Sequence, residues 1–153
     1  MTDTKKKPAK RSEGAETWTA EEKAAMQEHA RDLKARRSGK KVDGAADLLA
    51  KIAEMPPADK ALAERINALV TATAPNLVPR TWYGMPAWSR EDGKLVCFFQ
   101  AAAKFKARYA TFGFEEHAKL DDGTMWPTSF AVTTGFSDAD EKKLAALLTK
   151  ALS

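Results

Sequence analysis

The hydrophobic pattern of this 153-residue chain changes its period near residue 77, and this change limits the folds open to it. Before residue 77, apolar side chains recur at helical spacing. After it, short alternating apolar runs are separated by glycine or charged turns. A last helical pattern closes the chain. Helices, then consecutive short strands, then one helix predict an α+β fold, with a mainly antiparallel sheet of four to five strands packed against helices.

Four helices are expected from local start signals. Thr19 and Glu22 form a capping-box pattern for the first, which should end near residue 38. Asp43 is the expected N-cap of the second helix, Pro57 begins the third, and Ser137 caps the last. Their expected apolar stripes are Met26, Ala30 and Leu33; Leu48, Leu49, Ile52 and Met55; Leu62, Ile66, Leu69 and Val70; and Leu144, Leu147, Leu148 and Leu152.

Five strands are expected between the third and fourth helices, over residues 77–83, 86–89, 94–100, 104–112 and 125–133. Asp92-Gly93 favours a hairpin turn of the primed type between two of them. Residues 115–119 are predicted to form one short helical turn.

Charge and composition divide the chain into three parts. Residues 1–41 hold 12 Lys/Arg against 7 Asp/Glu, whereas residues 42–153 hold 13 against 14. We expect a disordered basic tail over 1–16, a helical extension over 17–41 and an α+β domain over 42–153. No apolar run approaches the roughly 20 residues needed to span a bilayer, and the basic N-terminus lacks the apolar region of a secretory leader. The single cysteine excludes an internal disulfide, so a cytoplasmic protein with no membrane partner is expected.

The segment T-W-Y-G-M-P-A-W (81–88) gathers aromatic side chains beside Gly84 and Pro86. It is typical of a tight structural corner, with these two residues setting the bend. Alternatively, its aromatic groups line a ligand pocket, because tryptophan combines a large apolar surface with a polar group. The candidate wall consists of Trp82, Met85, Trp88 and Trp126.

Positive charge alternates with apolar residues in K-F-K-A-R-Y-A-T-F (104–112). On a strand, Lys104, Lys106 and Arg108 would form a ladder on one face, with neighbours about 6.6 Å apart. Lys106 and Arg108 are then candidate partners for a carboxylate or phosphate. The alternative is a solvated sheet face on which lysines discourage aggregation.

Residues 115–122 contain the compact set of candidate metal ligands, namely Glu115, Glu116, His117, Asp121 and Asp122. Carboxylates with one imidazole suit iron, manganese or magnesium. Ordinary turn chemistry is the alternative for Asp121-Asp122-Gly123. Cys97 lies in the apolar run L-V-C-F-F and is expected to be buried and inert. No familiar catalytic arrangement is evident, so no catalytic residue is assigned.

Four segments resemble the YdhG-like domain-of-unknown-function family: W-Y-G-M-P-A-W (82–88), V-C-F-F-Q-A-A-A-K-F-K (96–106), T-F-G-F (111–114) and L-D-D-G-T-M-W-P (120–127). The resemblance covers roughly residues 45–150. Some members are described as frataxin-like iron chaperones with an antiparallel sheet packed against helices. The resemblance therefore implies iron binding by surface carboxylates and delivery to iron–sulfur or haem assembly.

The leading hypothesis is a non-enzymatic binding protein, in its most specific form a weak iron carrier that uses the acidic residues of 115–122. The second hypothesis is a module that binds an anionic small molecule or peptide through the aromatic groups, Lys106 and Arg108. Nucleic-acid binding through the basic arm ranks last. The sequence does not indicate an oligomeric state.

Overall fold

The computed structural model describes residues 19–37 and 43–153, with side chains for 19–31 and 43–153. In chain order the elements are α2 (Ala20–Arg37), α3 (Gly44–Ala53), α4 (Pro57–Thr73), β1 (Val78–Trp82), β2 (Met85–Ser89), β3 (Leu95–Gln100), η1 (Ala103–Phe105), β4 (Ala110–Phe114), β5 (Ser129–Val132) and α5 (Asp138–Ala151). The predicted tail over 1–16 and the predicted end of the first helix at Ser38-Gly39 lie outside the described residues.

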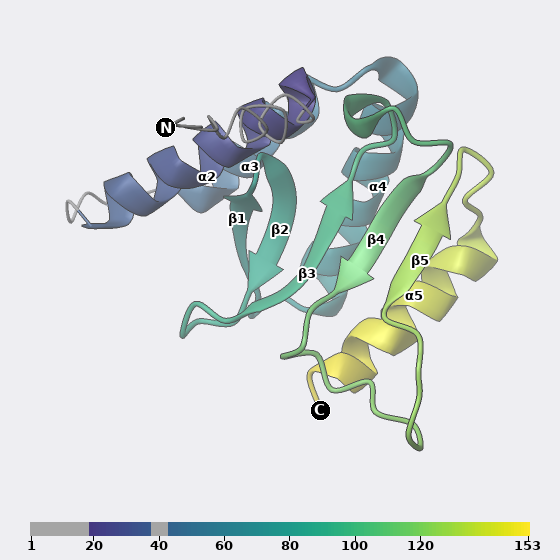
Figure 1. The fold of residues 1–153 in the computed structure, drawn as a ribbon. Helices are drawn as coiled ribbons and strands as arrows, with labels where there is room; N and C mark the ends of the chain where they lie inside the picture. Colours follow the sequence, from purple (N-terminus) through teal and green to yellow (C-terminus); the bar gives the residue numbers. More distant parts are fainter. Residues whose placement is uncertain (1–18, 38–42) are drawn as a thin grey trace, which may run out of the picture.

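The five strands form one antiparallel sheet in the order β1-β2-β3-β4-β5. Each strand therefore pairs with the next along the chain. Figure 1 shows α4 running behind the sheet and α5 beside the β5 edge. This architecture confirms the α+β fold class and the antiparallel sheet expected from the change of period.

One face of the sheet forms the core together with α3, α4 and α5. Alternate strand positions such as Trp88, Phe99 and Phe112 turn fully buried side chains toward these helices. Burial of a large apolar side chain contributes about 1.5–3 kcal/mol, so these contacts hold the layers together. The helices contribute Leu48, Ile52, Leu62, Ile66, Val70, Leu144 and Leu148 to the same cluster.

The β1–β2 connection is a two-residue turn of Tyr83 and Gly84, whose φ values are 53° and 77°. Two positive φ values between directly paired strand ends identify a type I′ turn, whose twist matches the strands. The predicted corner at 81–88 is therefore present, but Pro86 does not set the bend. It lies within β2 opposite Thr81, and the pairing of β2 with β3 begins one residue later.

A β-bulge explains why β3 has two consecutive buried residues. Trp88 pairs with Cys97, yet the next residue of β2, Ser89, pairs with Leu95, so Val96 is the extra residue of β3. Val96 and Cys97 are both fully buried in the core. This confirms the burial predicted for the thiol.

The predicted helix starts are confirmed. The Thr19 hydroxyl accepts a hydrogen bond from the N–H of Glu22 at 3.0 Å. The Asp43 side chain accepts one from Ala46 at 3.1 Å. Ser137 and Asp140 form a reciprocal capping box at the start of α5. Each such cap satisfies amide groups that a helix end leaves without partners.

The predicted apolar stripes hold for α4 and α5 but are partly wrong for α2 and α3. Leu49 on α3 is 55% exposed, and Met26 on α2 is 45% exposed. Ala30 is also exposed, whereas Ala25 is buried. Met26 and Ala30 are exposed because α2 contacts η1 and the β1–β2 turn instead of the main core. The side chain of Leu33 lies outside the described residues.

Three predicted local elements are corrected. The strand expected over 125–133 spans only Ser129–Val132. In the β2–β3 turn only Gly93 has a positive φ, and its N–H donates to the Arg90 carbonyl, so the turn is not of the primed type. The Ala118 N–H donates to the Glu115 carbonyl, which makes one turn without a helix.

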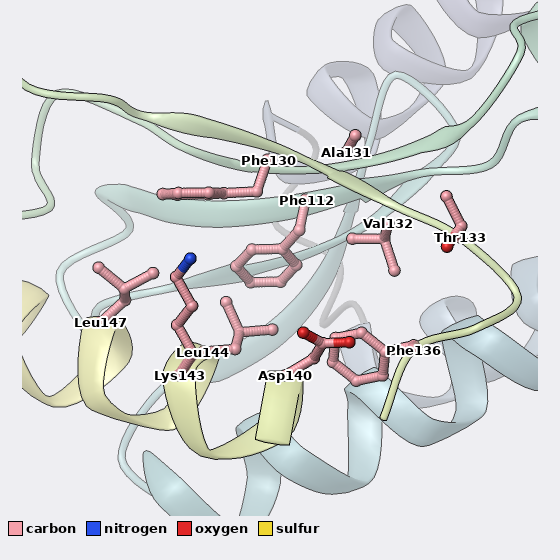
Figure 2. A pocket seen from close by; sticks show the side chains of 10 residues that line it. All are labelled: Phe112, Phe130, Ala131, Val132, Thr133, Phe136, Asp140, Lys143, Leu144 and Leu147. Atoms are coloured by element: carbon pink, nitrogen blue, oxygen red, sulfur yellow. The ribbon is translucent and has the colours of Figure 1, made fainter. Parts of the chain in front are cut away.

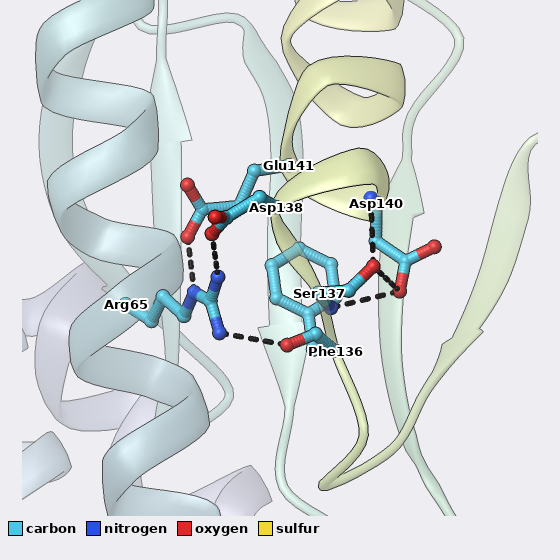
Figure 3. Close-up of polar contacts among 6 residues, drawn as sticks. All are labelled: Arg65, Phe136, Ser137, Asp138, Asp140 and Glu141. Atoms are coloured by element: carbon cyan, nitrogen blue, oxygen red, sulfur yellow. Dashed lines mark hydrogen bonds and ion pairs between the residues drawn. The ribbon is translucent and has the colours of Figure 1, made fainter.

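Arg65 joins α4 to the start of α5 (Figure 3). Its guanidinium donates to the Phe136 carbonyl at 2.7 Å, to Asp138 at 2.8 Å and to Glu141. The hydrogen bond to Glu141 is the main cause that raises the pKa of Arg65. This network fixes the closing helix against the core from the solvent side.

Candidate functional site

The cationic segment 104–112 is not one strand. Residues 103–105 form the 3-10 turn η1, Lys106 is left-handed with φ of 53°, and β4 begins only at Ala110. The Ala107 N–H donates to the Ala102 carbonyl at 2.9 Å and the Lys106 N–H to Ala103 at 3.2 Å, which is the Schellman pattern of a helix end. The predicted ladder of Lys104, Lys106 and Arg108 is therefore wrong.

Asp59 explains why this segment turns. Its buried carboxylate, in the first turn of α4, accepts hydrogen bonds from the N–H groups of Ala102 at 3.3 Å and Ala103 at 3.0 Å. These amides would lack partners at the start of η1, so the carboxylate stabilises the turn over an extended strand. The strand β4 begins only after the three cations.

The turn separates the three cations. Lys106 and Arg108 are exposed, and the Arg108 guanidinium lies 5.1 Å from the centre of the Tyr109 ring. Lys104 is half-buried instead, and its ammonium points to the β1–β2 turn. Its Nζ donates to the Gly84 carbonyl at 3.3 Å and lies 5.7 Å from the centre of the Phe105 ring. Of the described acidic groups, none lies within ion-pair distance of this ammonium.

A cavity of about 310 Å³ opens beside Lys104. Its walls come from the end of α3, the connection between α3 and α4, the β1–β2 turn with the start of β2, and the end of β3 with η1. We call it the Lys104 pocket. It is lined by Lys51, Glu54, Met55, Pro56, Gly84, Met85, Pro86, Phe99, Ala101, Ala103 and Lys104. Most of this surface is apolar, with two ammonium groups and one carboxylate at its polar end.

Charge at the polar end is unevenly shared. The Lys51 ammonium lies 2.9 Å from a carboxylate oxygen of Glu28 on α2 and 3.7 Å from one of Glu54. Burial lowers the pKa of Lys104, and the charge of Lys51 lowers it further. Burial alone would raise the pKa of Glu28, but the hydrogen bond and charge of Lys51 bring it below its ordinary value. Lys51 thus has two carboxylates at ion-pair distance, whereas the charges of Glu28 and Glu54 act on Lys104 from farther away and offset the lowering of its pKa only in part.

Helix α2 covers the neighbouring side of the turn. The His29 and Tyr83 rings stack with centroids 4.1 Å apart and an interplanar angle of 21°. His29 Nδ1 is buried and has no hydrogen-bond partner among the residues that the structure describes. A second hollow between α2 and the turn is lined by Glu22, Ala25, Met26, Tyr83, Met85, Gln100 and Phe105. Met85 belongs to both hollows, so α2 borders the Lys104 pocket.

The aromatic wall expected from the sequence is divided between the two faces of the sheet. Trp82 and Met85 are direct cross-strand partners, and the Trp82 ring lies 5.3 Å from the Phe98 ring. Trp88 belongs to the core, fully buried, with its ring 6.2 Å from that of Phe112. Trp126 precedes β5 and packs half-buried against the same core. Only Met85 of the four lines the Lys104 pocket.

The acidic stretch 115–122 connects β4 with the loop before β5. Glu115 and His117 are half-buried, whereas Glu116, Asp121 and Asp122 are exposed. Within the part of the chain that the structure describes, no three His, Cys, Asp or Glu side chains are grouped as metal ligands.

The same stretch is anchored through its backbone. Arg90 donates to the His117 carbonyl at 3.2 Å, and the Lys119 N–H donates to the Ala151 carbonyl at 2.9 Å. These two bonds tie the stretch to the β2–β3 turn and to the end of α5.

A third cavity, of about 300 Å³, lies between β5 and α5 (Figure 2). Phe130 and Val132 from the strand face Leu144 and Leu147 from the helix, with Phe112 between the layers. Asp140 and Lys143 are its charged lining residues. The two side chains carry opposite charges, so the lining of this cavity has no net charge.

Asp59, Lys51 and Glu28 were not singled out by the sequence. Each acts through a contact between distant segments, and a hydrogen bond from Ala103 to a residue 44 positions earlier leaves no local pattern. Lys104 was noticed, but as part of a ladder. The run Ala101-Ala102-Ala103 before it is the signal for a helical turn, because alanine is the strongest helix former.

Comparison with known proteins gives no match: no family model, curated protein or solved structure matches this chain. Across residues 19–37 and 43–153, no helix combines the length and apolar character needed to cross a bilayer.

Proposed function

We propose that this protein is a binding module, without a reaction of its own, that holds a small organic anion in the Lys104 pocket. The observation that carries the proposal is the half-buried ammonium of Lys104, whose only described hydrogen bond goes to the Gly84 carbonyl. Partial removal of a charge from water is unfavourable unless an opposite charge compensates it. A bound anion would supply that charge.

The pocket walls support a ligand with an apolar body. Met55, Met85 and Phe99 give the cavity flexible and aromatic surface, and Pro56 and Pro86 give it rigid surface. Small-molecule sites combine such surface with a few polar groups, and their volumes start near 300 Å³. The cavity volume of about 310 Å³ therefore suits a small ligand rather than a nucleotide or a folded partner.

This proposal keeps the anionic ligand expected from the sequence but assigns different basic residues to bind its negative charge. Lys106 and Arg108 are exposed and do not line the cavity, whereas Lys104 and Lys51 do. Of the aromatic and sulfur-containing candidates, Met85 is retained as a wall residue.

A thermal-shift measurement tests the proposal. Hexanoate and benzoate should raise the melting temperature, because a ligand selective for the folded state stabilises it by mass action. Lys104→Gln should abolish this rise, whereas Lys106→Gln, the same change in the same turn, should preserve it. Equal stabilisation of both variants, or no stabilisation of the native protein by any small acid, would contradict the proposal.

Iron binding remains a separate prediction from the family resemblance. It assigns the metal to Glu115, Glu116, His117, Asp121 and Asp122. Anaerobic calorimetric titration with ferrous iron, on protein purified without a histidine tag, tests it. Binding that persists unchanged in Asp121→Ala and Asp122→Ala variants would remove those two carboxylates from the metal site.

A further inference from the structure

The charges around the Lys104 pocket restrict the ligand beyond its being an anion. Lys51 and Lys104 bring two positive charges, and Glu54 in the wall and Glu28 at the rim bring two negative ones. Both carboxylates lie at ion-pair distance from Lys51, whereas the ammonium of Lys104 has no carboxylate at that distance among the described groups, and Glu28 and Glu54 act on it only from farther away. A second negative charge on a ligand would face Glu54 and Glu28.

Glu28 reaches this end of the pocket from α2. A β-carbon placed on Gly84 would lie 3.6 Å from Cγ of Glu28 and 2.5 Å from Nζ of Lys104. The side chains of Glu28 and Lys104 therefore both lie next to Gly84 in the β1–β2 turn. The Lys51–Glu28 pair is well shielded, with side chains 18% and 22% exposed. The carboxylate of Glu28 therefore already pairs with Lys51, one of the two ammonium groups that a ligand carboxylate could use.

We infer that the ligand is a monocarboxylate with a compact apolar body, and that Glu28 competes with its carboxylate for Lys51. This inference rests on the proposed function of the pocket. The ligand's carboxylate binds at Lys104, its apolar part lies against Met55, Met85 and Phe99, and Lys51 contributes only as far as Glu28 releases it. A dianion such as a phosphate monoester binds more weakly than a carboxylate of similar size.

The test is calorimetric titration of the full chain with hexanoate and with hexanol, its uncharged counterpart. Glu28→Gln should tighten hexanoate binding about two- to fivefold, the fold-change expected from removal of one competing ion pair of modest strength. It should leave hexanol binding unchanged. Glu21→Gln, an identical change of charge on the same helix, should have no such effect. In a Lys51→Gln background, Glu28→Gln should lose its effect, because the competition acts through Lys51.

Benzoate and phenylphosphate test the charge class, and benzoate should bind more tightly to the native protein. Hexanoate binding that requires Lys104 but is unchanged or weakened by Glu28→Gln would overturn this inference and leave the proposed function standing. Tighter binding of phenylphosphate would overturn the monocarboxylate assignment in the same way. Absence of hexanoate and benzoate binding to both native protein and Glu28→Gln would overturn the inference and the proposed function together.

Discussion

The carboxylate of Asp59, in the first turn of α4, accepts a hydrogen bond from the backbone N–H of Ala103 at 3.0 Å. The other oxygen of the same carboxylate accepts one from Ala102 at 3.3 Å. These bonds set the turn that places Lys104 at the pocket. A residue that does not line the pocket thus determines where the ammonium of Lys104 lies.

Asp59→Ala should lower both stability and ligand affinity. It leaves two backbone N–H groups without their acceptor, and an unsatisfied buried donor costs about 1–3 kcal/mol. Urea unfolding should show a loss of this size, and hexanoate should bind more weakly. Asp59→Asn keeps one acceptor oxygen, so its stability and its hexanoate affinity should lie between those of the native protein and of Asp59→Ala. Native-like hexanoate affinity in Asp59→Ala would mean that η1 holds Lys104 without Asp59.

Gly84→Ala should damage the pocket through Lys104. Gly84 has a φ of 77°, and an added β-carbon would come within 2.5 Å of the Lys104 ammonium. The left-handed backbone costs an L-residue about 1–2 kcal/mol. Gly93→Ala is the matched control, because Gly93 has a φ of 89° with no atom within 4 Å of the added carbon.

Both glycine variants should therefore lose similar stability in urea unfolding, but only Gly84→Ala should lose hexanoate affinity in calorimetry. An equal loss of affinity in the two variants would show that general destabilisation, and not the displaced ammonium, is responsible.

The Cys97 thiol should be unreactive in the folded protein. It is fully buried, and burial raises its pKa well above the ordinary value, so little thiolate forms. An aromatic disulfide reagent at pH 8 should label it only after unfolding in urea, at a rate that follows the population of open molecules. Rapid stoichiometric labelling without denaturant would contradict the buried position of β3.

The capping box of α5 should make stability depend on acid pH. Hydrogen bonds from the backbone N–H of Ser137 at 2.9 Å and from its hydroxyl at 3.0 Å lower the pKa of Asp140. The folded pKa is below the unfolded one, near 4. Its contribution is therefore present above about pH 4 and disappears as the pH falls through the folded value.

Urea midpoints of the native protein and Asp140→Asn should accordingly differ at pH 5 and converge toward pH 2. Asp122→Asn, the same change on an exposed loop, should show no such convergence. A constant difference between native protein and Asp140→Asn over this range would contradict the role of the carboxylate.

Local signals in the sequence predicted most of the fold. Asp43 and Ser137 cap their helices as expected, because capping depends on residues two or three positions apart. The stripes of α4 and α5 were also correct, since both helices face the core. The face of α2 could not be predicted in this way, because its partner is the Tyr83–Gly84 turn and not a continuous apolar surface.

The candidate site was less accessible to sequence reasoning. Alternating residues over 104–112 suggested a strand, but a distant acceptor, Asp59, favours a turn at Ala103. Lys104 consequently lies in η1 and not on a strand face with Lys106 and Arg108. Predicting this would have required knowing that α4 begins beside the end of β3, which is a property of the tertiary structure.

The most direct test of the account is an NMR titration of the Lys104 side chain with and without saturating hexanoate. In the free protein, its pKa should lie below that of an exposed lysine, because burial and Lys51 disfavour the charged form. Bound hexanoate should raise it, since a carboxylate beside the ammonium stabilises the protonated state. A Lys104 pKa that stays the same in free and hexanoate-saturated protein would show that no carboxylate lies at this ammonium.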